Sequence, residues 1–303
     1  AKGLWGVYAV FSAMCGVAFW AAGMEPLDAL MHMFTTVSLG GLSSHDQSFG
    51  YFQSPLLEAI CIAFMLAASC NFALYFVALR KGHWGGFWHD PEVRATLFAL
   101  MGGGLLVAAL LWVKGVYGPL DALRYAMFNV ISLATTTGYA TVDYLGWPVF
   151  APVFMLLLSG VATSAGSTGC GIKMVRMLIL LKQARREMNR LVHPRAVQPV
   201  RLGDAVVDNR VIFSVLAFML VYGATIIGLS MVLLLTDLDP VTAFSAVIAS
   251  VNCTGPGLGL VGPASNYAVL TDFQIWVCTL AMLLGRLEIL SFMALLTPAF
   301  WRR

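Results

Sequence analysis

Long apolar stretches alternate with short polar connections along almost the whole chain. A helix needs about 20 apolar residues to cross a bilayer. Six stretches reach roughly that length, the fourth of them interrupted by small polar residues: 4–23, 56–79, 96–117, 148–183, 211–236 and 270–299. Three shorter apolar segments lie between them, near 27–39, 121–135 and 240–252. These have the length of re-entrant helices, so the pattern predicts an all-α, polytopic membrane protein.

Composition agrees with this prediction and excludes several other classes. Of the 303 residues, 59% are hydrophobic and 11% are charged, whereas soluble domains carry about 25% charged residues. The chain is therefore neither an ordinary soluble enzyme nor a nucleic-acid-binding protein nor a disordered segment. The net charge of +3 is too small to indicate a polyanionic partner.

Charged residues predict which side of the membrane each connection faces. Fifteen of the eighteen basic residues fall at the two termini, in the 80–94 loop or in the 173–210 stretch. By the positive-inside rule these regions, and both termini, are cytoplasmic. Nine of the fifteen acidic residues fall on the opposite side, where they would raise the local concentration of cations. Each of them alone is equally well explained as a solvated loop residue.

The chain contains an internal repeat, in which the same five segments occur three times in the same order. They are a span, an outer turn with proline, a short apolar segment, a Gly/Thr-rich connection that we call the elbow, and a second span. The turn prolines are Pro26, Pro119 and Pro240. The elbows are TTVSLGGLSSHD (35–46), ATTTGYATVD (134–143) and NCTGPGLG (252–259). We align their glycines as Gly40, Gly138 and Gly255.

The elbows have the composition of a cation-selective pore lining. Non-helical backbone at membrane depth survives only where it is buried in protein or lines water. Glycine allows successive carbonyls to point the same way, and a ring of carbonyls can replace the hydration shell of a monovalent cation. Packing glycines between helices, or ordinary outer turns, are the alternative explanation of any single elbow. Three elbows in register favour the pore.

The same segments resemble the Trk/Ktr/HKT superfamily of potassium transporters, and most closely its bacterial TrkH family. The resemblance rests on TTVSLGGLSSHDQSFGYFQSP (35–55), FNVISLATTTGYATVDYLGWPVFAPVF (128–154), SAGSTGCGIKMVR (164–176), NCTGPGLGLVGP (252–263) and LLGRLEIL (283–290). It implies that 1–90, 91–207 and 208–303 are three pore repeats, similar to the second, third and fourth repeats of that family. The family's pore has four. A first repeat is therefore expected to precede this chain in the full protein, and the chain alone is expected not to form a selective pore.

The resemblance also implies the residues that bind potassium and those that gate the pore. Potassium is expected on the backbone carbonyls of Ser38, Leu39 and Gly40, of Thr136, Thr137 and Gly138, and of Cys253, Thr254 and Gly255. The family usually has Asn where Cys253 stands, a change that a carbonyl ligand tolerates. The resemblance further implies potassium uptake across the bacterial inner membrane, a homodimer, and a TrkA-like, nucleotide-binding regulatory ring docked on the basic cytoplasmic face.

The interruption of the fourth span forms a glycine-rich loop, SGVATSAGSTGCGIK (159–173). Its glycines are Gly160, Gly166, Gly169 and Gly171, and each costs about 1 kcal/mol relative to Ala in a helix, so the segment should be unwound. In the resembling family this loop blocks the pore beneath the filter. A packing face of small residues is the alternative.

Arg286 lies inside the last apolar stretch, where a charge needs a compensating partner. Glu288 lies about 200° further around a helix and pairs poorly. We therefore expect the guanidinium to bind carbonyls and hydroxyls of the glycine-rich loop and to act in gating. A structural arginine between helices is the alternative.

Other candidate chemistry is weak. The six cysteines lie in or beside apolar runs without a CxxC pair, and the five histidines are not at metal-ligand spacing. GxSxG, HExxH and Walker motifs do not occur, so we expect no enzyme and no cofactor, with potassium as the substrate. A secondary transporter of another cation, which would have inverted repeats, and a non-conducting membrane scaffold remain as alternatives.

Overall fold

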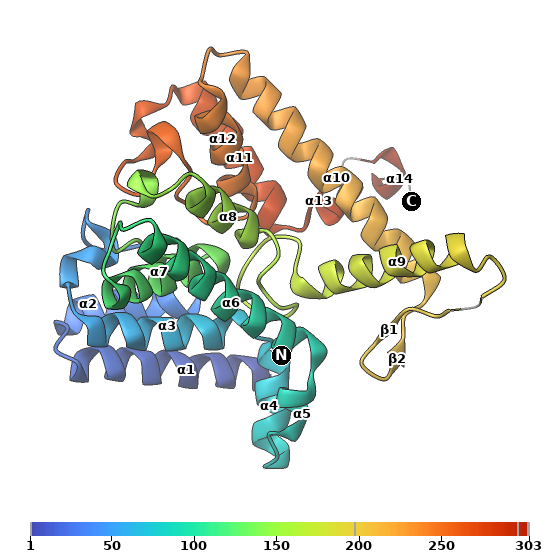
Figure 1. Cartoon of the computed structure of the whole chain (residues 1–303), viewed down its shortest axis with the longest axis horizontal. Helices are drawn as coiled ribbons and strands as arrows, with labels where there is room; N and C mark the ends of the chain where they lie inside the picture. Colours follow the sequence, from blue (N-terminus) through green and yellow to red (C-terminus); the bar gives the residue numbers. More distant parts are fainter. Residues whose placement is uncertain (1, 197, 296, 302–303) are drawn as a thin grey trace.

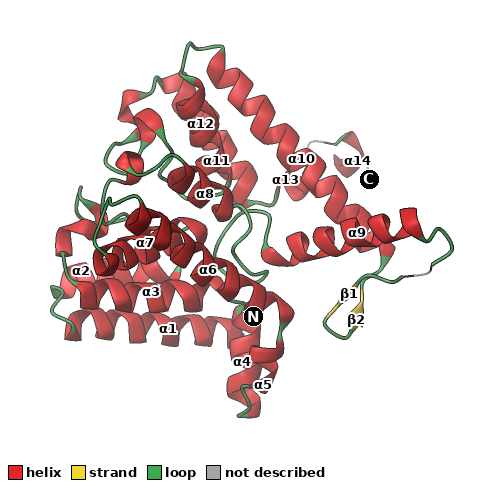
Figure 2. Cartoon of the chain, in the orientation of Figure 1, coloured by secondary structure: helices red, strands yellow, loops and turns green. Residues whose placement is uncertain are grey.

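A computed structural model describes residues 2–196, 198–295 and 297–301. Its regular structure is almost entirely helical (Figure 2). In the described ranges the strands are two short ones, β1 (Arg201–Leu202) and β2 (Ala205–Val206), which pair as an antiparallel hairpin. The expected all-α membrane fold is confirmed.

Three continuous helices form the first span of each repeated unit: α1 (Lys2–Ala21), α6 (Pro91–Val113) and α10 (Asn209–Leu234). Each is long and apolar enough to cross a membrane. Each packs against the short helix that follows it: α2 (Pro26–Val37), α7 (Pro119–Ala134) and α11 (Pro240–Val251). The predicted re-entrant segments are therefore helices of the predicted length.

The three short helices begin alike. Pro26, Pro119 and Pro240 each occupy the first helical position, where the missing N–H of proline costs no hydrogen bond. Asp239 caps α11 by accepting the Thr242 backbone N–H at 2.9 Å. Hydrogen bonds from Thr242 lower the pKa of the Asp239 carboxyl.

The second span is broken in all three units. The pairs are α3 (Pro55–Ser69) with α4 (Phe72–Lys81), α8 (Phe150–Ser159) with α9 (Met174–Val192), and α12 (Asp272–Arg286) with α13 (Ile289–Leu295). The sequence predicted only the middle break. The predicted continuous spans 56–79 and 270–299 are wrong, because the chain bends by 90° between α3 and α4 and by 103° between α12 and α13.

The backbone changes conformation at Cys70 and at Glu288, the sites of the two unexpected bends. Cys70 is extended, and the Asn71 side chain accepts the Ala73 backbone N–H, so α4 starts afresh with its own cap. At the second bend Glu288 adopts a left-handed backbone with φ of 55°, which ends α12 and lets α13 begin in a new direction. Both bends lie inside apolar runs, so hydropathy alone does not show them.

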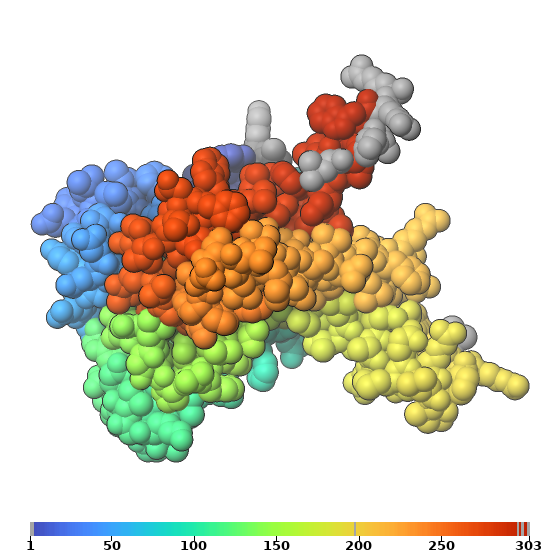
Figure 3. All heavy atoms as spheres, turned by 90° about the horizontal axis from the view of Figure 1, so that it is seen from above, coloured from blue at the N-terminus to red at the C-terminus, as the bar shows by residue number. Residues whose placement is uncertain are grey.

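The remaining elements connect these helices. They are α5 (Gly85–His89), α14 (Pro298–Trp301) and four 3-10 turns: Ser48–Phe52, Tyr144–Gly146, Gly259–Val261 and Tyr267–Val269. The first unit lies at one side of the molecule and the third at another, with α6, α7 and α8 between them (Figure 1). Helix α9 and the β1–β2 hairpin project from this body (Figure 3).

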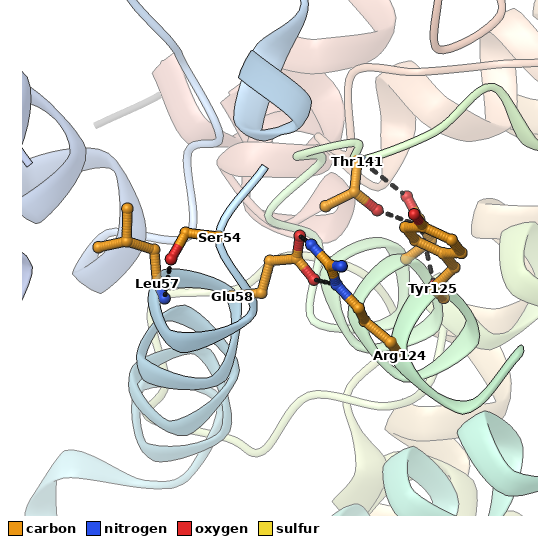
Figure 4. A network of polar contacts seen from close by, with 7 residues as sticks. Ser54, Leu57, Glu58, Arg124, Tyr125 and Thr141 are labelled. Carbon is orange, nitrogen blue, oxygen red and sulfur yellow. Dashed lines mark hydrogen bonds and ion pairs between the residues drawn. The ribbon is translucent and has the colours of Figure 1, made fainter. Parts of the chain in front are cut away.

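Helix packing joins neighbouring units, and an ion pair also joins the first unit to the second. Helix α3 packs on α7, and α8 packs on α11. Glu58 of α3 accepts two hydrogen bonds from Arg124 of α7, from Nε and from Nη2, each 2.7 Å long (Figure 4). The Glu58 side chain is only 4% exposed, whereas that of Arg124 is 27% exposed. The bidentate geometry fixes the first unit against the second.

We predict that Arg124→Met destabilises the full-length protein more than Glu58→Gln does. The first change leaves a buried carboxylate without its partner, at a cost of about 3 kcal/mol, whereas the second leaves a neutral amide beside a partly hydrated arginine. Thermal unfolding in detergent measures the difference. The double variant should recover part of the loss, and simple addition of the two effects would contradict a direct coupling.

Candidate functional site

The three elbows share one backbone conformation. Each short helix ends at a residue with negative φ: Ser38, Thr135 or Asn252. The first and the third residues after it have positive φ, in the left-handed region. The left-handed pairs are Leu39 and Gly41, Thr136 and Gly138, and Cys253 and Gly255. Side chains rarely adopt this conformation, and it costs about 1–3 kcal/mol at a non-glycine residue unless the surroundings enforce it. The same strained turn in three places indicates a shared structural task.

The positions of these left-handed pairs change the alignment of the first elbow with the other two. Gly40 and Gly41 both donate their backbone N–H to Thr35 O, as Thr137 and Gly138 both donate to Ser132 O. Gly40 therefore corresponds to Thr137, and Gly41 corresponds to Gly138 and Gly255. The triplet in register with Thr136–Gly138 and Cys253–Gly255 is 39–41, so the predicted triplet of Ser38, Leu39 and Gly40 is displaced by one residue. Two adjacent glycines made the sequence alignment ambiguous.

Consecutive elbows approach each other so closely that only glycine fits. A Cβ atom on Gly41 would lie 1.9 Å from the Thr137 carbonyl oxygen of the second elbow. A Cβ atom on Gly138 would lie 1.9 Å from the Thr254 carbonyl oxygen of the third elbow. At Gly255 the described atoms leave the same position open to 4 Å. The elbows thus follow one another in the same sense, with carbonyl oxygens and glycines in contact at each step.

Buried side chains hold the second elbow in place. The Asn129 amide nitrogen donates to Tyr125 O and Thr141 Oγ1, each at 2.8 Å, and the amide oxygen accepts from the Thr141 N–H at 3.2 Å. The Tyr139 hydroxyl hydrogen-bonds to Thr35 Oγ1 at 2.5 Å and so ties the second elbow to the first. The sequence analysis missed both residues. The available signal was an Asn inside a predicted short helix and a Tyr directly after the elbow glycine Gly138.

The third elbow is tied to the second unit in the same manner. Asn252 Oδ1 accepts a hydrogen bond from the Tyr222 hydroxyl at 2.7 Å, and its amide nitrogen donates to Ser159 Oγ at 3.0 Å. Tyr222 belongs to α10 and Ser159 to the end of α8. Asn252 therefore fixes the elbow and the start of the glycine-rich loop together.

The glycine-rich loop lies against all three elbows. Thr168 Oγ1 donates to Val37 O at 3.0 Å, at the end of α2, and the Cys170 N–H donates to Thr136 Oγ1 at 3.1 Å. At the third elbow, Asn252 Nδ2 donates to the hydroxyl of Ser159, the first residue of the loop, at 3.0 Å. The loop is thus seated across the C-terminal ends of the short helices.

The loop glycines have different environments. Gly166 and Gly171 have positive φ angles of 76° and 87°. A Cβ atom on Gly169 would lie 3.1 Å from both Thr135 O and Thr136 Oγ1, so the backbone at this position sits directly under the second elbow. Gly160 closes the loop, because its carbonyl accepts the Ile172 N–H at 2.6 Å.

Arg286 binds the loop. Its Nη1 donates to Thr168 O at 3.0 Å, which confirms the expected contact with the loop for one carbonyl, and it contacts the thiol of Cys170, rather than a hydroxyl, at 3.3 Å. Glu288 pairs instead with Arg176 at 2.9 Å. A cavity of about 340 Å³ lies between the loop and this end of α12, lined by Cys170, Lys173, Arg286 and neighbouring residues.

Glu92 of α6 is a second anchor of the loop, and sequence reasoning missed it. Its Oε1 accepts the N–H of Ala165, inside the loop, at 2.6 Å and the N–H of Val175, in the first turn of α9, at 3.2 Å. The side chain is buried. In the sequence it stands in a charged segment, DPEVR, that reads as a solvated helix start.

The chemistry of the site is that of closely spaced backbone oxygens. Among the described residues, no three His, Cys, Asp or Glu side chains are grouped as ligands of a metal ion. Clustered carbonyl oxygens suit a weakly held, dehydrated monovalent cation.

Comparisons with known proteins agree with this geometry. The family model described as "TrkH: Cation transport protein" matches residues 1–302. The Trk system potassium uptake protein TrkH of Vibrio parahaemolyticus is 42% identical over 305 residues, covering 100% of this chain and 62% of that protein. TrkH of Escherichia coli K12 is 38% identical, with the same coverage.

A solved structure matches as well. The crystal structure of the potassium transporter TrkH from Vibrio parahaemolyticus superimposes with a TM-score of 0.95 and 42% identity, over 99% of this chain and 64% of that one. The chain spans about 62% of the length of these curated relatives. The chain belongs to the TrkH family of cation transport proteins.

Proposed function

We propose that this chain contributes three of four pore units to a protein that takes up potassium across the bacterial inner membrane. In this proposal, segments 1–90, 91–207 and 208–303 are successive units, and a further unit completes the ring next to Gly255. The observation that carries the proposal is the repeated contact of Gly41 with Thr137 O and of Gly138 with Thr254 O. The relatives named above are potassium uptake proteins, which supports the choice of ion.

The proposed filter consists of the backbone carbonyls of the three triplets in register. These are Leu39, Gly40 and Gly41, then Thr136, Thr137 and Gly138, and then Cys253, Thr254 and Gly255. The short helices point their C-terminal ends, with partial negative charge, toward this region, which favours a cation. All three elbows have the same hand and register, whereas a secondary transporter with inverted repeats would present them in opposite senses.

The glycine-rich loop is the proposed gate. Seated across the elbows, it occupies the route below the filter, and Arg286 both holds it and places a positive charge beside that route. A cation leaving the filter would meet a steric and an electrostatic barrier. Opening therefore requires the loop to leave Thr136, Val37 and Arg286 together.

The proposed assembly follows the family resemblance. We propose a homodimer with both termini of this chain in the cytoplasm, and a TrkA-like nucleotide-binding ring on the basic face of α9. Helix α9 and the hairpin project from the helical body and carry many of the basic residues, a surface suited to a cytosolic partner (Figure 3).

The filter is tested by Gly138→Ser in the full-length protein. A side chain there would strike Thr254 O and strain a residue with φ of 90°, so the carbonyl geometry must change. We expect the preference for potassium over sodium to fall by about tenfold, which corresponds to ~1.4 kcal/mol of lost discrimination. Rubidium and sodium uptake in cells lacking other potassium uptake systems measures it.

Gly223→Ser is the matched control for this change, because no atom lies within 4 Å of the added Cβ in α10. It should leave the preference unaltered. An unaltered preference in a well-expressed Gly138→Ser protein would remove the second elbow from the filter.

The role of Arg286 is tested by Arg286→Ala and Arg286→Lys. Removing the guanidinium frees Thr168 O and lifts the charge barrier, so rubidium flux should rise several-fold with unchanged selectivity. Lysine keeps the charge but lacks the planar guanidinium fork, so the flux of Arg286→Lys should lie between those of the wild type and of Arg286→Ala. Arg94→Ala, an exposed arginine of α6, serves as the control. Wild-type flux in a normally inserted Arg286→Ala protein would make this arginine purely structural.

The anchor at Glu92 is tested by Glu92→Ala. The backbone N–H of Ala165 in the loop and that of Val175 at the start of α9 lose their acceptor, at a cost of about 1–3 kcal/mol each if they stay buried, so the loop should leave its seat more often. We predict that Glu92→Ala has a higher flux with unchanged selectivity. In the double variant with Arg286→Ala, the flux should rise by less than the sum of the two separate increases. Glu187→Ala on the exposed face of α9 is the control. Lower flux at normal protein level would show that Glu92 supports the open route.

A further inference from the structure

Arg176, in the first turn of α9, holds the carboxylate of Glu288 at the bend between α12 and α13. Its Nη2 donates to Glu288 Oε2 at 2.9 Å, and its guanidinium carbon lies 4.1 Å from the centre of the Phe218 ring of α10. The side chain of Arg176 is 21% exposed, whereas that of Glu288 is 56% exposed. One arginine therefore joins α9, α10 and the bend, through an ion pair and a cation–π contact.

Glu288 also shares a cavity with the arginine that binds the loop. It has a φ angle of 55° and interrupts the helix two residues after Arg286, so the two side chains are not kept on opposite faces of one helix. Both line the cavity of about 340 Å³ between the loop and the end of α12, together with Lys173. Among the described residues that line this cavity, Glu288 is the only acidic one. The carboxylate that Arg176 binds therefore borders the same cavity as the guanidinium that holds the loop.

We propose that Glu288 is a positioning residue of the gate, and that Arg176 keeps its carboxylate away from Arg286 while the loop is seated. In this state each arginine has its own acceptor: Arg176 binds Glu288, and Arg286 binds the Thr168 carbonyl oxygen at 3.0 Å. A carboxylate is a stronger acceptor for a guanidinium than a carbonyl oxygen is. A Glu288 side chain that loses Arg176 therefore turns to Arg286 and draws it from Thr168 O, which releases the loop.

The contact between Arg176 and Glu288 is suited to such an exchange of partners. An ion pair with one partner more than half exposed is only weakly stabilising, so it opens and forms again readily. Arg176 lies in the first turn of α9, directly after the loop ends at Lys173, so a displacement of that turn separates it from Glu288. The consequence for ion flux rests on the function and the gate proposed above, whereas the exchange of partners does not.

The experiment measures rubidium uptake by the full-length protein in proteoliposomes, per amount of inserted protein. Arg176→Met keeps an apolar side chain over Phe218 but removes the ion pair, and we expect its flux to be several-fold higher than that of the wild type. Glu288→Gln should have no higher flux than the wild type, and the double variant should return to the flux of Glu288→Gln, because a neutral amide does not draw Arg286 from the loop. Arg176→Gln tests the same step with a polar side chain and takes the place of Arg176→Met if that protein does not insert. Arg185→Gln, at an exposed position of the same helix, is the control and should have wild-type flux.

The pattern of fluxes distinguishes this exchange from simple packing. A high flux that persists in the double variant shows that Arg176 acts without Glu288 and overturns the proposal, as does wild-type flux in an inserted Arg176→Met protein.

A structure of the full-length Arg176→Met protein gives a second reading that does not depend on transport. In it the Arg286 guanidinium should bind Glu288 and no longer Thr168 O, and an Arg286 that stays on Thr168 O overturns the proposal. A wild-type protein without rubidium uptake contradicts the proposed function, and the structure of the variant then still decides which acceptor Arg286 takes.

Discussion

Backbone groups at membrane depth must find partners inside the protein, and this constraint shapes the whole molecule. Lipid cannot satisfy a bare N–H or C=O, so every elbow and every broken span needs a dedicated acceptor or donor. The glycine-rich loop supplies the partners of the backbone groups at the break after α3. Ser69 O accepts the Ser164 N–H at 3.0 Å, and the Phe72 N–H donates to Gly166 O at 3.2 Å. The breaks and the loop therefore depend on one another.

The same constraint explains the buried polar side chains. Asn129, Asn252 and Glu92 each form hydrogen bonds with two or more backbone or hydroxyl groups. Tyr139 adds a bond between units rather than within one. Elbows fixed by buried hydrogen bonds and a loop held by a few contacts suit the gated filter that we propose, because such a filter must keep its geometry while the gate moves.

Sequence patterns predicted what depends on local chemistry. Apolar run length and N-terminal prolines located α2, α7 and α11, and the concentration of glycine located the middle break. The breaks near Cys70 and Glu288 were missed, because their partners lie far away in the chain while the local sequence stays apolar. The register of Gly41 was missed for a related reason, since only the contact with Thr137 O distinguishes it from Gly40. The loop contact of Arg286 was predicted because a charge in an apolar run demands a partner.

The central claim is that the three triplets in register bind potassium through their backbone carbonyls. Anomalous diffraction from crystals of the full-length protein grown with rubidium or thallium in place of potassium tests it directly. The account predicts an anomalous peak among the backbone carbonyls of residues 39–41, 136–138 and 253–255, and no such peak from crystals grown in sodium alone. An intramembrane peak bound elsewhere, with none among these three elbows, would contradict it.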